Sequence, residues 1–455
     1  MLNIKKSLYT ALISKFVFPL HEFVKNHDSV QIRNEMEKTQ WWSIDDLHYL
    51  QLSRLKTLLL NAQQSVPYYR NLFNQLSFNV HEVVTLSDLE KLPILDKQTI
   101  REQIGFLKTE NKQKLIRAAT SGSSGEPLVF YLGKDRISHD VAAKWRATRW
   151  WGVDIGDPEI VIWGSPIELG AQNYLRNLRD KIFRTRLFPT KVMSPAVLSK
   201  YLAEIRRTHP KILFGYPSSI ALLAQYAQSQ NQKMSDLGIE VVFVTAERLY
   251  NEQSRLISTV FGCPVANGYG GRDAGFIAHA CPEKGMHITA EDMIVEIVDS
   301  DGNILPAGQS GEIVITHFFS QDFPFIRYRT GDFGVIDDRR CSCGRNLPLL
   351  KEIQGRSNDF LVSVDGVKMH EVDFTSILRN QPEIKFFKVV QETLMQVNIY
   401  IVSKPDLDRL LVQQIEQTFK TRLGQTVNIV VDQVAEIPAE KSGKFRYVVS
   451  KVASQ

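Results

Sequence analysis

The hydrophobic positions of the first hundred residues follow a helical period. From Leu47 to Ala62 apolar side chains recur at helical spacing, and Pro67 ends the run. The stretch from Met1 to Lys25 is also apolar, but Lys15 and Pro19 interrupt it well short of the ~20 residues that a membrane span needs. We therefore expect no transmembrane segment and an amphipathic helix that lies on the protein body, with a membrane-surface anchor as the alternative.

Helical and strand patterns alternate in the middle of the chain. Helical periods cover 195–210, 218–228 and 251–261, whereas short apolar runs typical of buried strands cover 211–216, 239–244 and 264–267. Alternation of this kind predicts a three-layer α/β domain, in which helices cover both faces of a sheet.

After residue 290 the hydrophobic period changes to two. The alternation from Ile294 to Ile297, the turn Asp301-Gly302-Asn303 and a strand at 312–316 predict a β-hairpin. The stretch after Arg356 has its own strand and helix signals. The predicted fold class is therefore α/β, with a large N-terminal α/β domain over residues 1–355, which has a helical N-terminus and a β-rich segment, and a small α+β C-terminal domain over residues 356–455.

Composition narrows the class of protein without identifying it. The apolar fraction of 43% and the charged fraction of 23% are those of a globular chain, and a formal charge of +5 on 455 residues gives no basis for nucleic-acid binding. The four cysteines are too few for the disulfide framework of a small secreted domain. We expect a cytoplasmic protein.

A loop rich in glycine and hydroxyl groups stands between two strand-like runs, 115–118 and 128–131. Backbone N–H groups beside glycine can approach an anion closely, and hydroxyls add donors, so such a loop suits phosphate binding. It lacks the Lys of a Walker A loop, and a flexible Ser/Gly-rich turn is the alternative. The candidate nucleotide-binding residues are Thr120, Ser121, Gly122, Ser123, Ser124 and Gly125.

Further motifs follow this loop in a fixed order. They are Tyr269-Gly270-Gly271-Arg272-Asp273, Tyr328-Arg329-Thr330-Gly331-Asp332, Gly355-Arg356 and Gly443-Lys444, and Leu92-Pro93-Ile94-Leu95-Asp96-Lys97 precedes them. The set resembles the adenylate-forming enzymes, and within them the phenylacetate–CoA ligases and their CapK-like relatives. The resemblance covers most of the chain and implies a mobile C-terminal domain.

The resemblance implies roles for three charged residues. Attack of a carboxylate on the α-phosphate of ATP collects negative charge on the phosphoryl oxygens, so Lys444 would be the catalytic cation, with Lys441 as a rival. Asp332 would accept hydrogen bonds from the ribose hydroxyls, or else bond its own turn. Arg356 would lie near the ribose or the hinge between the domains. Relatives have an aspartate at the hinge where this chain has Asn358.

The Tyr269 motif would bind the adenine and the metal. Tyr269 would stack on the base beside Gly270 and Gly271, and Arg272 and Asp273 would be catalytic. Relatives usually end this motif in glutamate, which holds Mg²⁺; an aspartate keeps the charge with a shorter reach. Glu247, in a Thr-Ala-Glu sequence where the family has Thr-Gly-Glu, would lie by the nucleotide or simply serve as a helix N-terminal charge.

Three of the four cysteines fall into a metal-ligand pattern. Cys281 and His287 are followed by Cys341 and Cys343, which together make a complete tetrahedral set for zinc. His279 could replace His287, and incidental buried thiols are the alternative. Four protein ligands leave no position for water, so the predicted zinc is structural.

The predicted function is a two-step ligase. A small carboxylic acid reacts with ATP and Mg²⁺ to give acyl-AMP and pyrophosphate, and the acyl group then passes to CoA or to an amine or hydroxyl of a sugar, the latter in polysaccharide or capsule biosynthesis. A non-catalytic nucleotide-binding or scaffold protein is the alternative of another class. A monomer or a homodimer is expected.

Overall fold

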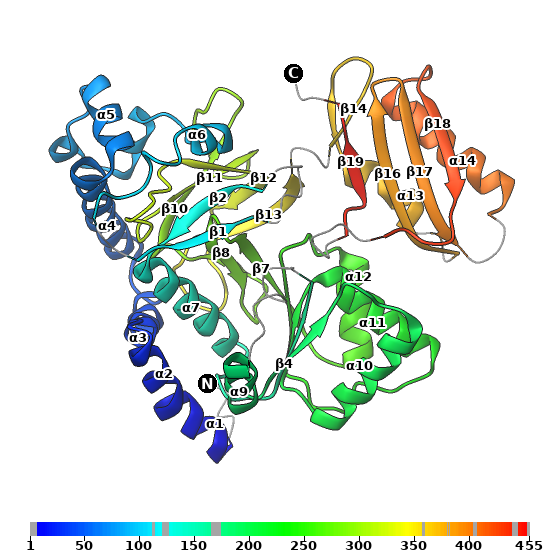
Figure 1. The fold of residues 1–455 in the computed structure, drawn as a ribbon. Helices are drawn as coiled ribbons and strands as arrows, with labels where there is room; N and C mark the ends of the chain where they lie inside the picture. The colour runs from blue at the N-terminus through cyan, green and yellow to red at the C-terminus, as the bar shows by residue number, and fades with distance from the viewer. Residues whose placement is uncertain are drawn as a thin grey trace. The chain divides into compact units, whose positions relative to one another are not determined.

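The computed structural model describes residues 7–111, 114–120, 127–164, 174–356, 360–379, 381, 383–403, 407–438 and 445–452 (Figure 1). The chain divides into two compact units. The first consists of Met1–Thr330 and Gly334–Ile353, and the second of Gly331–Phe333 and Gln354–Gln455. The second unit therefore includes a short piece of chain from inside the first.

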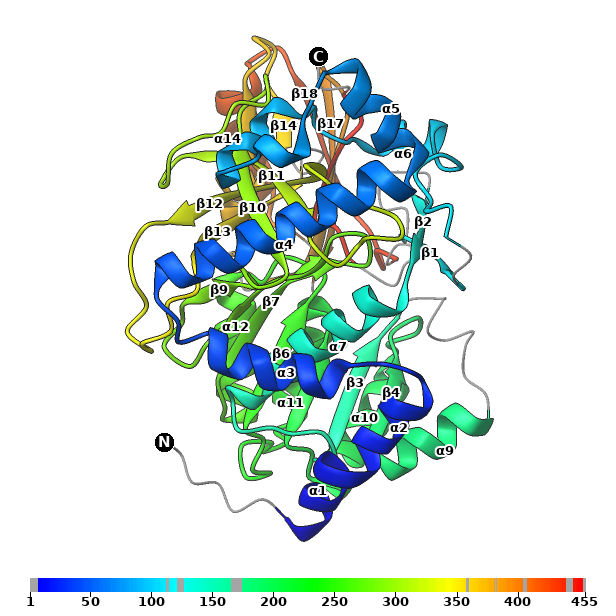
Figure 2. The ribbon, with the colours of Figure 1, turned by 90° about the vertical axis from the view of Figure 1, so that its left-hand side faces the viewer.

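The first hundred residues are helical, as their hydrophobic period predicts. Proline and polar caps delimit these helices; the Ser43 side chain accepts a hydrogen bond from the backbone N–H of Asp46 at the start of α4. Figure 2 shows them following one another along one side of the first unit. The elements are α1 (Leu8–Leu12), the π-helical turn η1 (Ile13–Val17), α2 (Phe18–Val24), α3 (Ser29–Thr39), α4 (Ile44–Ser65), α5 (Pro67–Gln75), η2 (Val80–Glu82), η3 (Leu86–Lys91) and α6 (Lys97–Glu102).

The first unit is built on one large sheet, with a separate two-stranded ribbon. Among the described residues, eleven strands pair in the order β10-β11-β12-β13-β9-β8-β7-β6-β5-β3-β4. The strands are β1 (Ile116–Ala119) and β2 (Val129–Leu132) in the ribbon, and β3 (Glu159–Trp163), β4 (Thr185–Pro189), β5 (Ile212–Gly215), β6 (Val241–Thr245), β7 (Val265–Gly271), β8 (Gly275–Ala280), β9 (Met286–Ile288), β10 (Met293–Val298), β11 (Ser310–His317), β12 (Tyr328–Asp337) and β13 (Leu349–Arg356) in the sheet.

Strands β3 to β7 form a parallel block with helices on both faces. Successive residues of β5 and β6 belong to different cores: Leu213 and Val242 pack in the cluster of α10, α11 and α12, whereas Phe214 and Phe243 pack in the cluster of α7. Side chains of a strand alternate between faces, so the predicted three-layer α/β arrangement is confirmed. The helices are α7 (Lys134–Arg149), α9 (Tyr174–Ile182), α10 (Pro195–Thr208), α11 (Pro217–Ser229) and α12 (Asn251–Phe261).

The antiparallel end of the sheet begins where β7 turns back into β8. The predicted hairpin is present, since β10 pairs antiparallel with β11 from Met293–His317 to Val298–Glu312. Helix α4 packs on this end, where the Gln51 side chain donates to the carbonyl of Met293 at 3.1 Å.

The second unit has a four-stranded sheet in the order β18-β17-β16-β19. Apolar side chains of its strands and helices share one core, which includes Phe374, Val389, Ile399 and Phe419. A separate α+β unit at the C-terminal end agrees with the fold class predicted from the sequence. Its elements are β14 (Phe360–Val362), β15 (Lys368–His370), α13 (Glu371–Arg379), β16 (Ile384–Thr393), β17 (Gln396–Ser403), α14 (Arg409–Leu423), β18 (Asn428–Gln433) and β19 (Val448–Ser450).

No helix within the described residues combines the length and the apolar character needed to cross a bilayer.

Candidate active site and metal centre

Several predicted site residues lie at the carboxyl ends of neighbouring parallel strands. Glu247 follows β6, Tyr269 lies near the end of β7, and the β7–β8 turn holds Arg272 and Asp273. In open α/β sheets ligands bind outside these carboxyl ends. Topology therefore brings together side chains that the sequence separates.

The β7–β8 turn needs its glycines. A Cβ at Gly270 would collide with the carbonyl oxygen of Gly275, and one at Gly271 would lie 2.6 Å from Oδ1 of Asp273. Gly275 has φ +84°, a conformation that other residues rarely adopt. The Gly270-Gly271 pair thus lets a sharp turn present Arg272 and Asp273.

Two buried side chains fix the position of Asp273. The hydroxyl of Tyr328 donates to Asp273 Oδ2 at 2.6 Å, and Arg136 Nη2 donates to the Asp273 carbonyl at 3.0 Å. Arg136 is itself held by Asp140, four residues further along α7, at 3.1 Å. The Tyr269 and Tyr328 motifs are therefore directly linked through a hydrogen bond.

The Leu92–Lys97 motif pairs with the start of β12, the strand that contains Tyr328. Leu95 and β12 exchange backbone hydrogen bonds of 2.9 Å, with Leu95 N–H donating to Arg327 and Arg329 N–H donating to Leu95. Lys97 Nζ donates to the Thr330 carbonyl at 2.7 Å. Arg327 strengthens this junction through a buried 3.0 Å ion pair with Glu296.

Asp332 and Arg356 form an ion pair within the second unit. Arg356 Nε donates to Asp332 Oδ1 at 3.1 Å, and both side chains are partly exposed. The structure brings these two predicted nucleotide residues together, although 24 positions separate them.

Glu247 stabilises a helix start. Its Oε2 accepts from the backbone N–H of Ser218 at 3.2 Å in the first turn of α11, where a carboxylate favours the helix dipole. The preceding residue, Ala246, has φ +69°. A left-handed alanine costs energy that the family's glycine at this position would avoid.

The glycine-rich loop is a strand–turn–strand connection. Strands β1 and β2 pair antiparallel up to Ala119 and Val129, and the Thr120 hydroxyl accepts from Leu128 N–H at 3.0 Å. The expected strands are thus present on both sides of the loop. The predicted site residues Ser121, Gly122, Ser123, Ser124, Gly125 and Lys444 lie outside the described residues, as do Lys441 and Asn358.

The four predicted metal ligands converge. One ligand atom from each of Cys281, His287, Cys341 and Cys343 lies within 4.8 Å of all the others. The sulfurs of Cys281 and Cys341 are 3.6 Å apart, and Cys343 Sγ is 3.3 Å from His287 Nε2. Tetrahedral ligands of a zinc ion at bond lengths of about 2.0–2.3 Å stand about 3.3–3.8 Å apart, so the donor set fits zinc.

Outer contacts orient the histidine of this cluster. His287 Nδ1 lies 3.3 Å from the Leu347 carbonyl, and a hydrogen bond there leaves Nε2 free to bind a metal. His279 is not part of the cluster; its ring packs against Trp150 with centroids 4.3 Å apart. Of the two histidines considered from the sequence, His287 has the required position.

The Cys343 loop also holds the N-terminal helices in place. Arg345 stacks over the ring of Trp150 at 4.1 Å and donates to the side chain of Gln40 at 3.0 Å. Trp150 donates to the same Gln40 oxygen at 2.8 Å. The cluster thereby connects β8, β9 and the β12–β13 loop to the end of α3.

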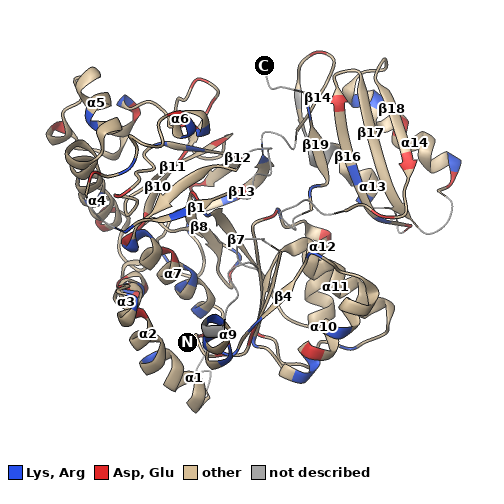
Figure 3. Ribbon diagram, in the orientation of Figure 1, with Lys and Arg blue, Asp and Glu red and all other residues tan. Residues whose placement is uncertain are grey.

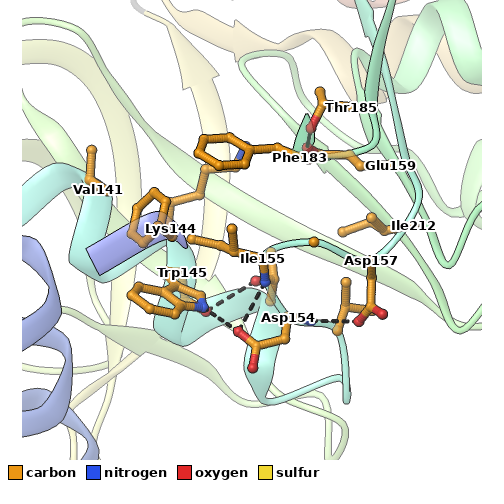
Figure 4. Close-up of a pocket in the computed structure, with 14 residues that line it drawn as sticks. Val141, Lys144, Trp145, Asp154, Ile155, Asp157, Glu159, Phe183, Thr185 and Ile212 are labelled. Carbon is orange, nitrogen blue, oxygen red and sulfur yellow. Dashed lines mark hydrogen bonds and ion pairs between the residues drawn. The ribbon is translucent and has the colours of Figure 1, made fainter. Parts of the chain in front are cut away.

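A cavity of about 260 Å³ lies elsewhere, at the amino ends of the parallel strands (Figure 4). Its lining includes Glu159, Thr185 and Ile212, which begin β3, β4 and β5. The polar groups that face it already have partners: Asp154 accepts from Trp145 Nε1 at 2.5 Å. Glu247 and Tyr269 lie at the opposite, carboxyl ends of the parallel strands.

Sequence reasoning missed the residues that hold Asp273. In the sequence Tyr328 is part of a motif but has no evident role, and nothing there singles out Arg136. The only available signal was the Arg136–Asp140 spacing of four residues, which is common on helix surfaces. A buried arginine cannot be recognised from such a pair.

Comparison with known proteins gives the class of the chain. Residues 185–318 match the AMP-binding enzyme family, and residues 361–451 match the CapK C-terminal domain. Protein CapK of Staphylococcus aureus is 24% identical over 90% of each chain. The phenylacetate-coenzyme A ligase of Thermus thermophilus is 24% identical over 89% of this chain and 96% of its own.

A solved structure shares the fold. The 2-hydroxyisobutyryl-CoA ligase in the postadenylation state superimposes with a TM-score of 0.74 and 20% identity, over 90% of this chain and 91% of that one. The fold, the ordered motifs and these matches define an adenylate-forming ligase. Within that class, the chain carries an AMP-binding enzyme match and a CapK C-terminal match, and it is similar to Protein CapK and to phenylacetate-coenzyme A ligases.

Proposed function

We propose that the protein activates a small carboxylic acid with ATP and then transfers the acyl group to a second nucleophile. A carboxylate oxygen attacks the α-phosphorus, the bond from that phosphorus to the bridging oxygen breaks, and pyrophosphate leaves. A thiol, amine or hydroxyl then attacks the acyl carbon, loses its proton and releases AMP. The linked position of Asp273 and Tyr328 is the observation that carries this proposal.

The fixed carboxylate suits a magnesium ion. Tyr328 occupies Oδ2 of Asp273, so Oδ1 is the oxygen that would face a hard cation such as Mg²⁺. Bound Mg²⁺ would neutralise charge on the phosphates as pyrophosphate departs. Arg272, beside it, would add a second positive charge; burial lowers the pKa of its guanidinium but leaves it a cation at neutral pH.

The nucleotide would use the remaining predicted contacts. Residues Thr120 to Gly125 would donate to the phosphates, and Tyr269, Gly270 and Gly271 would border the adenine. Asp332 would accept from the ribose hydroxyls, sharing its carboxylate with Arg356. Glu247, which already stabilises α11, would border the same ligand. Lys444 would stabilise the charge that develops on the α-phosphate.

The cysteine and histidine cluster would bind structural zinc. Three thiolates and one imidazole fill a tetrahedral shell, so no position remains for a water molecule. The ion would hold the β8–β9 turn against the β12–β13 loop. Arg345 of that loop would extend this connection to the N-terminal helices through its hydrogen bond to Gln40.

Coenzyme A is the acceptor that we place first, because phenylacetate-coenzyme A ligases cover almost the whole chain. The match to CapK over 90% of the chain favours a second candidate, an amine or hydroxyl of a sugar during polysaccharide biosynthesis.

The test is carboxylate-dependent ATP–pyrophosphate exchange over aryl, fatty, hydroxy and amino acids, followed by product analysis with CoA or with amino sugars. Exchange that needs one acid class identifies the first step. ATP binding without exchange for any acid would contradict adenylation and favour a binding protein.

A matched pair of variants tests the catalytic lysine. Lys444→Ala should abolish exchange while ATP still binds, because the cation acts on charge that develops during the reaction. Lys441→Ala is the control and should retain exchange. Equal activity of the two variants would refute the assignment of Lys444.

A further inference from the structure

The described chain begins with an uninterrupted helical segment over residues 8–24 that changes type in its middle. Helix α1 leads into the π-helical turn η1 and then into α2, with Pro19 in the first turn of α2. Proline has no N–H and clashes with the carbonyl four residues earlier, so a wider π turn accommodates it without breaking the helix. We call this segment the 8–24 helix.

The 8–24 helix buries a mixed face and exposes an apolar one. Its buried side holds the polar residues Thr10, Ser14 and Glu22 together with Ile13 and Phe18, all less than 9% exposed. Its outer side is a row of large apolar residues at spacings of three or four, each between 51% and 92% exposed. They are Leu8, Leu12, Phe16, Leu20, Phe23 and Val24. Large apolar rows of this kind are rarely left exposed to water.

The helix is held in this orientation by specific contacts. The Thr10 hydroxyl donates to Asp157 at 2.8 Å, and Tyr9 donates to the Ile182 carbonyl at 2.8 Å. Phe18 packs edge-on against Trp145 with ring centroids 4.9 Å apart. Glu22 is satisfied by Ser29 at 2.7 Å. Rotation of the apolar row inward would leave these polar groups without partners, which costs free energy. These contacts therefore keep the apolar row facing outward.

Cations border the apolar row. Lys15 is exposed on the helix itself, Lys25 is the C-cap at its end, and Lys181 and Arg184 are exposed on and just after α9. Figure 3 shows the Lys and Arg residues of α9 beside α1 and α2. Glu22, the only acid between residues 7 and 27, is buried.

The cations at the end of the helix repel one another. Burial lowers the pKa of Lys25, and the positive charges of Arg179 and Arg176 lower it further. The Arg184 guanidinium also lies over the Tyr9 ring at 5.3 Å, which places a cation next to the helix. A nearby surface of negative charge would relieve this repulsion.

We propose that the 8–24 helix and the end of α9 form a docking surface for an anionic lipid membrane. The apolar row enters the boundary between headgroups and acyl chains, and the bordering cations contact lipid phosphates. An apolar face flanked by Lys and Arg is the pattern of helices that lie in a membrane interface. A second copy of the chain fits less well, because it would bring the same cations against each other.

The test is flotation of the full-length protein with phosphatidylcholine vesicles that contain or lack phosphatidylglycerol. The wild type should float with the anionic vesicles and be released by high salt, which screens charge. Leu12→Gln/Phe16→Gln/Leu20→Gln should reduce the bound fraction roughly tenfold or more. Because these side chains face solvent, the fold should remain, as circular dichroism would verify.

Matched controls change the same chemistry elsewhere on the first unit. Leu76→Gln/Val84→Gln/Phe106→Gln alters three other exposed apolar residues and should bind as the wild type does. Lys15→Glu/Lys181→Glu should lose anionic vesicles, whereas Lys200→Glu/Lys233→Glu, with the same change in net charge, should keep them.

Two results would overturn the proposal. One is a wild-type protein that stays unbound with anionic vesicles at low ionic strength. The other is a wild-type dimer that the triple glutamine variant converts to monomers, since the apolar row would then be an interface between copies.

Discussion

The hydrogen bond from Tyr328 to Asp273 is the contact on which the proposed magnesium site depends. Tyr328→Phe removes one hydroxyl and keeps the ring, which is fully buried and packs against Phe325 with centroids 4.9 Å apart. The substitution therefore leaves the packing intact and frees Asp273 Oδ2, so that the carboxylate can rotate.

The expected magnitude follows from the type of bond. A hydrogen bond to a charged acceptor contributes about 1.5–3 kcal/mol, and about 1.4 kcal/mol corresponds to a tenfold change in rate. Tyr328→Phe should lower the rate of pyrophosphate exchange about ten- to a hundredfold. It should also raise the Mg²⁺ concentration needed for half-maximal exchange, because binding of the metal must then fix the orientation of the Asp273 carboxylate.

The control is Tyr69→Phe. Tyr69 is also buried, and its hydroxyl donates to the Pro324 carbonyl at 3.1 Å. It should lose about 1 kcal/mol of unfolding free energy, typical of a neutral hydrogen bond, with an unchanged Mg²⁺ requirement. If the two variants have the same Mg²⁺ dependence, Tyr328 does not position a metal ligand and the reasoning is wrong.

Three further predictions concern the metal, pH and backbone strain. Elemental analysis should find about one zinc per chain; Cys341→Ser/Cys343→Ser should remove it and cost ~3 kcal/mol or more of stability in urea unfolding, while Cys263→Ala keeps the metal. Burial and the positive charges of Arg136 and His139 hold the pKa of His317 well below its usual value. Near pH 6.5 the unfolded state therefore binds a proton at this residue that the folded state does not bind. Stability should thus fall below that pH, and His317→Asn should remove up to about 1.4 kcal/mol per pH unit of this dependence in unfolding measured from pH 7 to 5; an unchanged slope would contradict it. Ala246→Gly should raise the free energy of unfolding by about 0.5 kcal/mol, because the strain relieved at the left-handed alanine slightly exceeds the entropic cost of glycine. A lower free energy of unfolding would show that the turn is not strained.

Local sequence patterns were sufficient to predict the main helices and strands and to recognise the motifs in their order. The helix predicted at 251–261 is α12, because its apolar spacing is strong and Gly262 at φ +68° ends it. The strands around the glycine-rich loop and the 294–316 hairpin followed from alternation and turn residues in the same way. Such signals depend only on neighbours in the sequence, so they can be interpreted without a fold.

The sequence also identified the cysteine and histidine set, since few other reasons place two cysteines one residue apart. It named His287 as the ligand and kept His279 as an alternative, because spacing alone cannot decide between them. The structure separates them: they pair directly across β8 and β9, yet only His287 reaches the sulfurs of the cluster.

Contacts between distant segments were decided by the tertiary structure. The pairing of Tyr328 with Asp273, the support from Arg136 and the ion pair of Asp332 with Arg356 join residues that no period connects. The outward apolar row of the 8–24 helix depends on contacts of the same kind. Its composition predicted an amphipathic helix against the body, and the contacts of Thr10 and Glu22 decided which face turns outward. Sequence periodicity specifies that a helix has two faces, whereas the partners available in three dimensions determine which of them is buried.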